Sequence, residues 1–197
     1  MRILTFLALA VSAFAQSPEP AKKLVAAAKT QIGVTKSYDG AYTKLDYPGG
    51  DVPMERGVCT DVVIRAFRKV GLDLQQLVHE DMARAFEKYP QQWGLRKPDT
   101  NIDHRRVPNL MRFFERSGKK IAVSKKPEDY QPGDLVTCLI TSLVPPHLPH
   151  IMIVSDVPSS ADPKRLQVIH NIGCGAQLED RLFDFELTGH YRYWSAQ

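Results

Sequence analysis

The sequence of 197 residues has little of what marks a nucleic-acid-binding protein. Its 26 Lys and Arg residues exceed its 22 Asp and Glu residues by only four, and the basic residues form no dense run. Nucleic-acid-binding surfaces usually combine a strong basic excess with interleaved aromatic residues, so the composition excludes nucleic acid as the expected partner. The small positive charge is compatible with an anionic polymer of a cell envelope but does not require one.

Long apolar segments are missing everywhere except at the start of the chain. Arg2 precedes an apolar run over residues 3–10 and the small-residue site Ala13-Phe14-Ala15, which is the order of a secretory signal peptide. The run is shorter than the roughly 20 residues that cross a bilayer. We therefore expect a cleaved signal peptide over residues 1–15 rather than a buried N-terminal helix. The protein would be exported, periplasmic or secreted, with no transmembrane segment after cleavage.

Cysteine is scarce. The chain has three cysteines, Cys59, Cys138 and Cys174, and no Cys-x-x-Cys pair that would indicate a zinc or redox site. In an exported protein an odd number leaves one thiol without a partner in the same chain. If the strands near Cys138 and Cys174 are close, a disulfide between these two leaves Cys59 free; two buried free thiols are the alternative.

The remaining chain reads as one domain over residues 22–197, after a polar, Pro-containing linker at 16–21. Apolar periodicity predicts helices, and apolar runs between Pro-rich or polar segments predict strands. The helices are expected at 22–32, 59–70, 73–88 and 107–116, and the strands at 133–140, 150–157, 165–172 and 189–194. Helices followed by antiparallel strands predict the α+β class.

A long segment at 34–57 lies between the first two helices and holds Tyr38, Tyr42 and Tyr47. Loops of this length are usually functional or disordered, and the tyrosines favour an ordered, functional loop.

Cys59 follows this loop and opens the second predicted helix, in the segment RGVCTDVVIRAF. The partial positive charge of a helix N-terminus favours the thiolate, which is the nucleophilic form. Free backbone N–H groups at residues 59 and 60 would stabilise an oxyanion. Asp61 suits the helix N-terminus but would raise the thiol pKa if it pointed towards Cys59. A small buried residue opening a core helix is the alternative reading of Cys59.

Two histidines lie at the ends of predicted strands. His150 opens the strand HIMIVSDV and His170 ends the strand LQVIH. If these strands form a hairpin, the two imidazoles are cross-strand neighbours, so that His150 would be the base for a cysteine nucleophile and His170 would orient it. His147 competes with His150 but is expected in an exposed loop. Asn171 is a second candidate for the orienting role, on the other face if the strand continues.

A further cluster lies in NIDHRRVPNL, residues 101–110, where His104, Arg105 and Arg106 precede a helix. Arginine pairs bind carboxylates well, so the cluster is a candidate site for a substrate carboxylate. A solvated helix start in which Asp103 pairs with the arginines is the alternative.

Together these features resemble the papain-like cell-wall hydrolases of the NlpC type. The shared order is a helix, a Tyr-containing loop with Tyr38, Cys59 opening a helix, Gly133-Asp134-Leu135-Val136 starting a strand, and then His150 and His170. The NlpC pattern usually has Asp-Cys-Ser-Gly where this chain has Val58-Cys59-Thr60-Asp61. A second resemblance, over nearly all of the mature chain, is to a family of exported bacterial proteins with a domain of unknown function. The segments that carry it are SYDGAY, LDYPGGDVP, RGVCTDVVIRAFR, IDHRRVPNL, HIMIVSD, HNIG and TGHYRYW.

The NlpC resemblance implies a papain-like fold and a hydrolase that cleaves a peptide or amide bond of peptidoglycan with Cys59, His150 and His170. The candidates for oxyanion or substrate binding are Tyr38, Thr60, Asp61, His104, Arg105 and Asn171. No metal or cofactor is required; the expected partner is a cell-wall peptide or other envelope polymer, and the oligomeric state is left open. The main alternative is a non-catalytic envelope-binding module on the same fold. A zinc site formed by Cys59, His150 and His170 is a third reading, without supporting ligand spacing.

Overall fold

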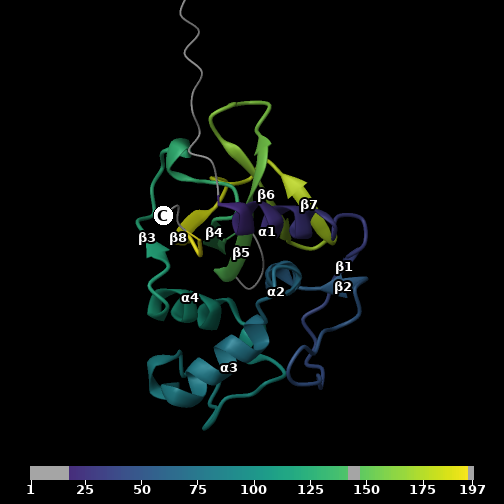
Figure 1. Cartoon of the computed structure of the whole chain (residues 1–197), viewed down its shortest axis with the longest axis vertical. Coiled ribbons are helices and arrows are strands. Elements are labelled where there is room, and N and C mark those ends of the chain that lie inside the picture. The colour runs from purple at the N-terminus through teal and green to yellow at the C-terminus, as the bar shows by residue number, and fades with distance from the viewer. Residues whose placement is uncertain (1–17, 142–146, 195–197) are drawn as a thin grey trace, which may run out of the picture.

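The computed structural model describes residues 18–141 and 147–194, so the expected signal peptide lies outside the described residues. The described residues form four α-helices, all of which precede the main β-sheet in the chain (Figure 1). They are α1 (Glu19–Lys29), α2 (Cys59–Lys69), α3 (Leu74–Arg84) and α4 (Val107–Arg116), with 3-10 turns η1 (Phe86–Lys88), η2 (Asp103–Arg105) and η3 (Pro127–Asp129). Within these described residues, no helix has the length and apolar character needed to cross a membrane.

The predicted helices are confirmed, with corrections at their ends. Helix α4 has the predicted bounds, with a proline in its first turn. Helix α1 begins inside the expected linker at 16–21, because Pro20 fits the first turn of a helix and Glu19 is a favourable charge there. The predicted helix at 73–88 is divided into α3 and η1.

A six-stranded sheet with the order β3-β8-β4-β5-β6-β7 forms the second half of the chain, and all its neighbouring strands are antiparallel. Its strands are β3 (Lys120–Ile121), β4 (Leu135–Ile140), β5 (Leu148–Pro158), β6 (Leu166–Asn171), β7 (Ala176–Glu179) and β8 (Glu186–Tyr191). The predicted α+β class and its strands are confirmed, whereas β3 and β7 were not predicted. The segment at 34–57 holds only a parallel pair of two-residue strands, β1 (Ser37–Tyr38) and β2 (Arg56–Gly57).

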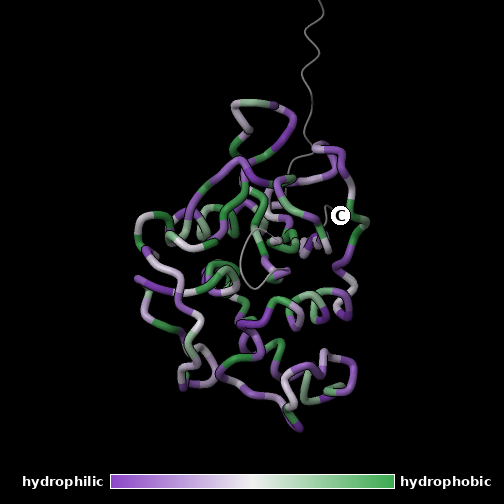
Figure 2. Tube along the Cα trace, turned by 180° about the vertical axis from the view of Figure 1, so that it is seen from behind, coloured by the Kyte–Doolittle hydropathy of each residue, from purple (hydrophilic) through white to green (hydrophobic). Residues whose placement is uncertain are grey.

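Alternation along the central strands separates two cores. On one face, Ile151 and Ile153 of β5 belong to the core formed with helices α1, α2 and α4. On the other face, Met152 and Val154 pack with Tyr130, Leu182 and neighbouring apolar residues of the connecting loops. Figure 2 shows apolar residues gathered along the central strands, while the tip of the β5–β6 hairpin is hydrophilic.

The start of β4 is fixed between helix and sheet. Gly133 has a φ of 90°, and a Cβ there would lie 2.8 Å from the Cβ of Ala21 in α1. The next residue, Asp134, accepts hydrogen bonds from Nε2 of His190 at 2.7 Å and from Arg192, which are on or beside β8. These contacts place β4, and with it the neighbouring strand β5, in a fixed position relative to α1.

Candidate active site

Cys59 is the first residue of α2 and lines a pocket of about 280 Å³. The helix begins here because the Asp61 carboxylate accepts a hydrogen bond from the backbone N–H of Val58 at 2.6 Å, which caps the first turn. The Cys59 side chain is only 2% exposed. Its sulfur therefore meets a ligand in this pocket rather than on an open surface.

Burial dominates the chemistry of this thiol and raises the pKa of Cys59 to about 11. The backbone amide of Ile151 lowers this pKa, the Asp61 carboxylate raises it, and the Thr60 amide and the Tyr38 hydroxyl lower it by smaller amounts. Desolvation therefore outweighs the helix N-terminus, which by itself favours the thiolate. At neutral pH the group is a thiol.

The Ile151 amide reaches the sulfur because β5 and β6 separate at this end of the hairpin. Pairing between the two strands includes Val154 with Val168 and Ile153 with Ile169, and it does not continue to Ile151. On its other side β5 stays paired, with Ile151 opposite Thr137 of β4. The N-terminus of α2 thus lies beside the part of β5 that is not paired with β6, where the backbone amide of Ile151 can hydrogen-bond to Cys59.

The two predicted histidines are in contact, which confirms that His150 and His170 are neighbours across the hairpin. Nε2 of His150 lies 2.8 Å from Nδ1 of His170, and Nε2 of His170 lies 2.8 Å from Oε2 of Glu179 on β7. Both imidazoles are buried. Burial, followed by the neighbouring His170 and Arg181, lowers the pKa of His150 to about 3. Burial also lowers the pKa of His170, against the opposing effect of Glu179.

Glu179 determines how protons are arranged along this chain of side chains. A carboxylate only accepts hydrogen bonds, so His170 carries its proton on Nε2 and presents a lone pair at Nδ1. The Nε2–H of His150 must then donate to that lone pair. Nδ1 of His150 is then the ring nitrogen without a proton and can act as a base.

Tyr38 is the one predicted oxyanion ligand whose side chain reaches the cysteine. Its hydroxyl hydrogen-bonds to Cys59, and burial of this hydroxyl and the proximity of Cys59 raise the pKa of Tyr38. The side chain is nevertheless 47% exposed and lines the same pocket. The Thr60 side chain points elsewhere and donates to the backbone carbonyl of Arg105.

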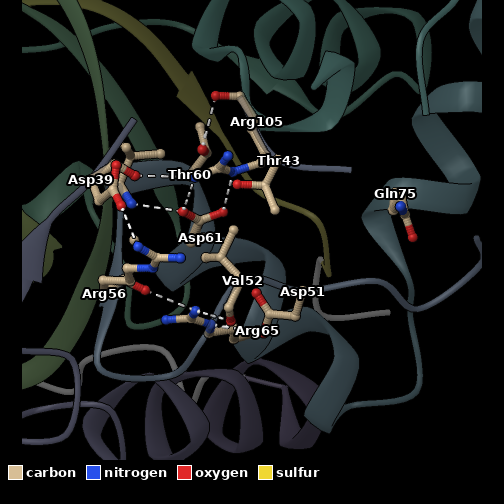
Figure 3. Close-up of polar contacts among 12 residues, drawn as sticks. Asp39, Thr43, Asp51, Val52, Arg56, Thr60, Asp61, Arg65, Gln75 and Arg105 are labelled. Atoms are coloured by element: carbon tan, nitrogen blue, oxygen red, sulfur yellow. Dashed lines mark hydrogen bonds and ion pairs between the residues drawn. The ribbon is translucent and has the colours of Figure 1, made fainter. Parts of the chain in front are cut away.

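Asp61 and Arg105 form a buried ion pair and are not available to a ligand (Figure 3). Nε and Nη2 of Arg105 each donate to one oxygen of Asp61 at 2.9 Å. The same guanidinium donates to the carbonyls of Asp39 and Ala41. The predicted substrate-binding role of both residues is therefore corrected to a structural one. The alternative of a solvated helix start paired with Asp103 is confirmed only in its pairing, because Arg106 donates to Asp103 at 3.0 Å, whereas Asp103, His104 and Arg105 are buried.

Asn171 and Arg65 hold other parts of the segment 34–57. Asn171 donates to the carbonyls of Ser37 and Gly57 and does not contact the imidazole pair, so it does not orient His150. Arg65 of α2 donates to the carbonyls of Val52, Pro53 and Arg56 (Figure 3). Side chains from distant elements thus give this loop the hydrogen bonds that a sheet would otherwise supply.

Three further predictions are settled by position. His104 is buried away from the residues that line the pocket, whereas His147 is exposed in a loop, as expected. Cys138 and Cys174 are both free, and the predicted disulfide is not formed. Strand β5 separates β4 from β6, so these strands lie about 10 Å apart, beyond the roughly 7 Å that a disulfide spans between Cα atoms.

The family model of a domain of unknown function, DUF1287, matches residues 25–193. The chain belongs to the DUF1287 family. It is 56% identical to the uncharacterized protein YijF of Escherichia coli (strain K12) over 167 residues, which cover 85% of this chain and 78% of YijF. Among solved structures, NlpC1 from Trichomonas vaginalis is similar with a TM-score of 0.48 and 13% identity. That match covers 92% of this chain and 47% of NlpC1, so the chain spans about half of its length.

Two residues of this site, Glu179 and Trp93, were not predicted from the sequence, whereas Arg106 belongs to the cluster that was a candidate site for a substrate carboxylate. Glu179 follows the glycine-flanked turn after β6 at a spacing that a short hairpin brings back alongside His170, so the signal was present but weak. Trp93 and Arg106 line the pocket with Cys59. Trp93 lies in an irregular segment, where no periodic pattern marks it.

Proposed function

We propose that this DUF1287 protein is a cysteine hydrolase that cleaves a peptide or amide bond, with Cys59 as nucleophile and His150 as general base. One arrangement carries the proposal. Cys59 opens a helix at the wall of a pocket, with the Tyr38 hydroxyl and the Ile151 amide on its sulfur. His150, the residue next to Ile151, begins a hydrogen-bonded chain that ends in a carboxylate.

The residues support an acyl transfer in two stages. The Cys59 sulfur attacks the carbonyl carbon while Nδ1 of His150 takes the thiol proton, and the oxyanion forms beside the Cys59 backbone N–H and the Tyr38 hydroxyl. The intermediate collapses to a thioester as His150 returns the proton to the leaving amine. A water molecule, losing a proton to His150, then attacks the thioester. Release of the carboxylic acid returns the proton to the sulfur and restores the neutral thiol.

The protonation states favour general-base catalysis over a preformed ion pair. The raised pKa of Cys59 and the lowered pKa of His150 both describe neutral groups at pH 7. Proton transfer must therefore accompany attack on the substrate carbonyl. In that step the carboxylate of Glu179 stabilises the positive charge that develops on the two imidazoles.

The proposed substrate is a peptide or amide bond of peptidoglycan, cleaved by an exported protein in the periplasm on a papain-like fold. The support is the order of Tyr38, Cys59, the Gly133-Asp134 strand start, His150 and His170 along the chain, which resembles that of the NlpC type. The segment at residues 1–15, with the features of a signal peptide, favours the same compartment.

Digestion of purified peptidoglycan sacculi tests the proposal. The mature protein is compared with Cys59→Ala, with His150→Ala and with the control Cys174→Ala, which removes an exposed thiol outside the site. Soluble fragments are identified by mass spectrometry. We expect fragments from the wild type and the Cys174 variant only, and the fragment masses name the bond. Equal fragments from wild type and Cys59→Ala would refute the cysteine mechanism.

The high thiol pKa also favours a second candidate, a non-catalytic module that binds the cell wall through the same pocket. If the protein is such a binding module, sacculi should bind the wild type and Cys59→Ala equally, and neither protein should release fragments. The same experiment, with a sedimentation step added, separates the two functions.

A further inference from the structure

Two arginines line the pocket that Cys59 lines, and the acids that pair with them, Asp61 and Asp103, are not among the lining residues. The charged side chains among its described lining residues are Arg105 and Arg106, and none of these residues is Asp or Glu. Much of the remaining lining is apolar or aromatic and consists of Val58, Trp93, Ile102, Val107, Pro108 and Pro149. Such a pocket suits a group that combines an apolar body with a negative end.

The two arginines differ in what their guanidinium groups still offer. Arg105 uses Nε, Nη1 and Nη2 on Asp61 and on two loop carbonyls, and its side chain is fully buried. Arg106 donates from Nη1 to Asp103 at 3.0 Å, and this is its one side-chain hydrogen bond within the described residues. The edge formed by Nε and Nη2 is therefore free, and the side chain is 18% exposed.

The guanidinium of Arg106 is held in place before any ligand arrives. Its central carbon lies 4.1 Å from the centre of the Trp93 ring, which also lines the pocket. Asp103 fixes the other side through Nη1, and Asp103 is itself held by the backbone N–H of Asp99. A planar guanidinium stacked on an aromatic ring presents its free edge in one direction, which is the geometry for binding both oxygens of a carboxylate.

We propose that Arg106, stacked on Trp93, binds a carboxylate of the substrate in the pocket beside Cys59, so that the protein selects acyl donors that carry a free carboxylate near the cleaved bond. This inference rests on the proposed function, because it names the substrate class for the same site. The pocket of about 280 Å³ is at the small end of ligand pockets, which suits one acidic residue of a peptide rather than a whole glycopeptide.

The test uses two forms of one peptide, the peptidoglycan stem tetrapeptide with free carboxylates and the same peptide with its carboxylates converted to carboxamides. Cleavage kinetics are measured for wild type, Arg106→Gln, Arg106→Lys and the control Arg112→Gln. Arg112 lies on α4, the helix that Arg106 precedes, but it is 45% exposed, pairs with Glu115 and does not line the pocket. Binding without turnover is measured with Cys59→Ala by calorimetry and by the fluorescence of Trp93.

We expect wild type and Arg112→Gln to prefer the carboxylate peptide in kcat/KM by roughly 10- to 100-fold, as for the loss of a charge-assisted hydrogen bond. Arg106→Gln should lose this preference mainly through KM for the carboxylate peptide. Arg106→Lys should restore part of the preference, because the charge is kept and the planar fork is lost.

The outcomes separate this inference from the proposed function. Equal cleavage of both peptides by wild type, or a preference that survives in Arg106→Gln, would overturn the carboxylate site and leave the hydrolase intact. Absence of cleavage, together with tight binding of only the carboxylate peptide by Cys59→Ala and loss of this binding in Cys59→Ala/Arg106→Gln, would overturn the hydrolase and support the site. Equal weak binding of both peptides by Cys59→Ala would count against the site in either case.

Discussion

Replacement of Glu179 by glutamine keeps the size of the side chain but adds a hydrogen-bond donor at the end of the imidazole chain. In the wild type the carboxylate accepts from Nε2 of His170 at 2.8 Å, and this fixes Nδ1 of His150 as the free base. A glutamine amide also donates to Nε2 of His170. This contact permits the reversed arrangement, in which Nδ1 of His150 carries the proton and cannot accept one from the thiol.

The expected cost follows from one charge-assisted hydrogen bond. Such a bond contributes about 1.5–3 kcal/mol, and because the Glu179 side chain is 30% exposed, the lower part of this range, about 1.5–2 kcal/mol, applies. At about 1.36 kcal/mol for each factor of ten, kcat should fall roughly 10- to 30-fold. Loss of the carboxylate also removes an influence that raises the pKa of His170, so protonation of the imidazole pair should move to lower pH in the variant.

Two assays measure this change. Nitrogen-15 NMR of the histidine rings reports directly which ring nitrogen is protonated, and it needs no substrate. In the wild type we expect the proton on Nε2 of both His150 and His170, and in Glu179→Gln a substantial population with the proton on Nδ1. Peptide cleavage gives kcat against pH. The control is Glu186→Gln, the same chemical change at an exposed position on β8. Unchanged ring protonation and an unchanged pH profile in Glu179→Gln would refute the reasoning.

Two further predictions concern the thiols and the buried ion pair. Iodoacetamide at pH 7 should label the exposed Cys174 first and Cys59 slowly, and the rate at Cys59 should rise towards pH 11, because burial raises its pKa to about that value. Peptide mass spectrometry measures both rates. Labelling of Cys59 at pH 6 as fast as that of Cys174 would contradict the raised pKa. Arg105→Ala leaves the buried Asp61 carboxylate without its partner, so urea unfolding should show a loss of about 3–5 kcal/mol in unfolding free energy. The control Arg112→Ala removes an exposed pair and should cost less than about 1 kcal/mol. Equal losses would mean that the buried pair is not the stronger contact.

Local signals predicted much of the fold. Helix α4 has its predicted bounds because Pro108 marks its first turn and Ser117-Gly118 follows its last. The contact between His150 and His170 was predictable because two strands joined by a short connection form a hairpin, whose open end brings the start of one beside the end of the other. Cys59 was placed correctly at the first position of α2.

The missing parts depend on contacts that sequence spacing does not encode. Asp61 and Arg105 are 44 residues apart, and each reads alone as a polar residue at a helix start. The possible disulfide between Cys138 and Cys174 required their segments to be close, and this condition is not met because β5 lies between β4 and β6 in the sheet. The raised pKa of Cys59 was not predicted because it follows from burial of the side chain, which depends on tertiary packing.

The backbone of the segment 34–57 is fixed before a substrate binds, because its carbonyls accept hydrogen bonds from Arg65, Arg105 and Asn171. Conformational freedom of this wall is already lost when the protein folds, so little remains to be lost on encounter with a ligand. We therefore expect ligand association to be limited by diffusion and orientation rather than by a loop motion of microseconds to milliseconds.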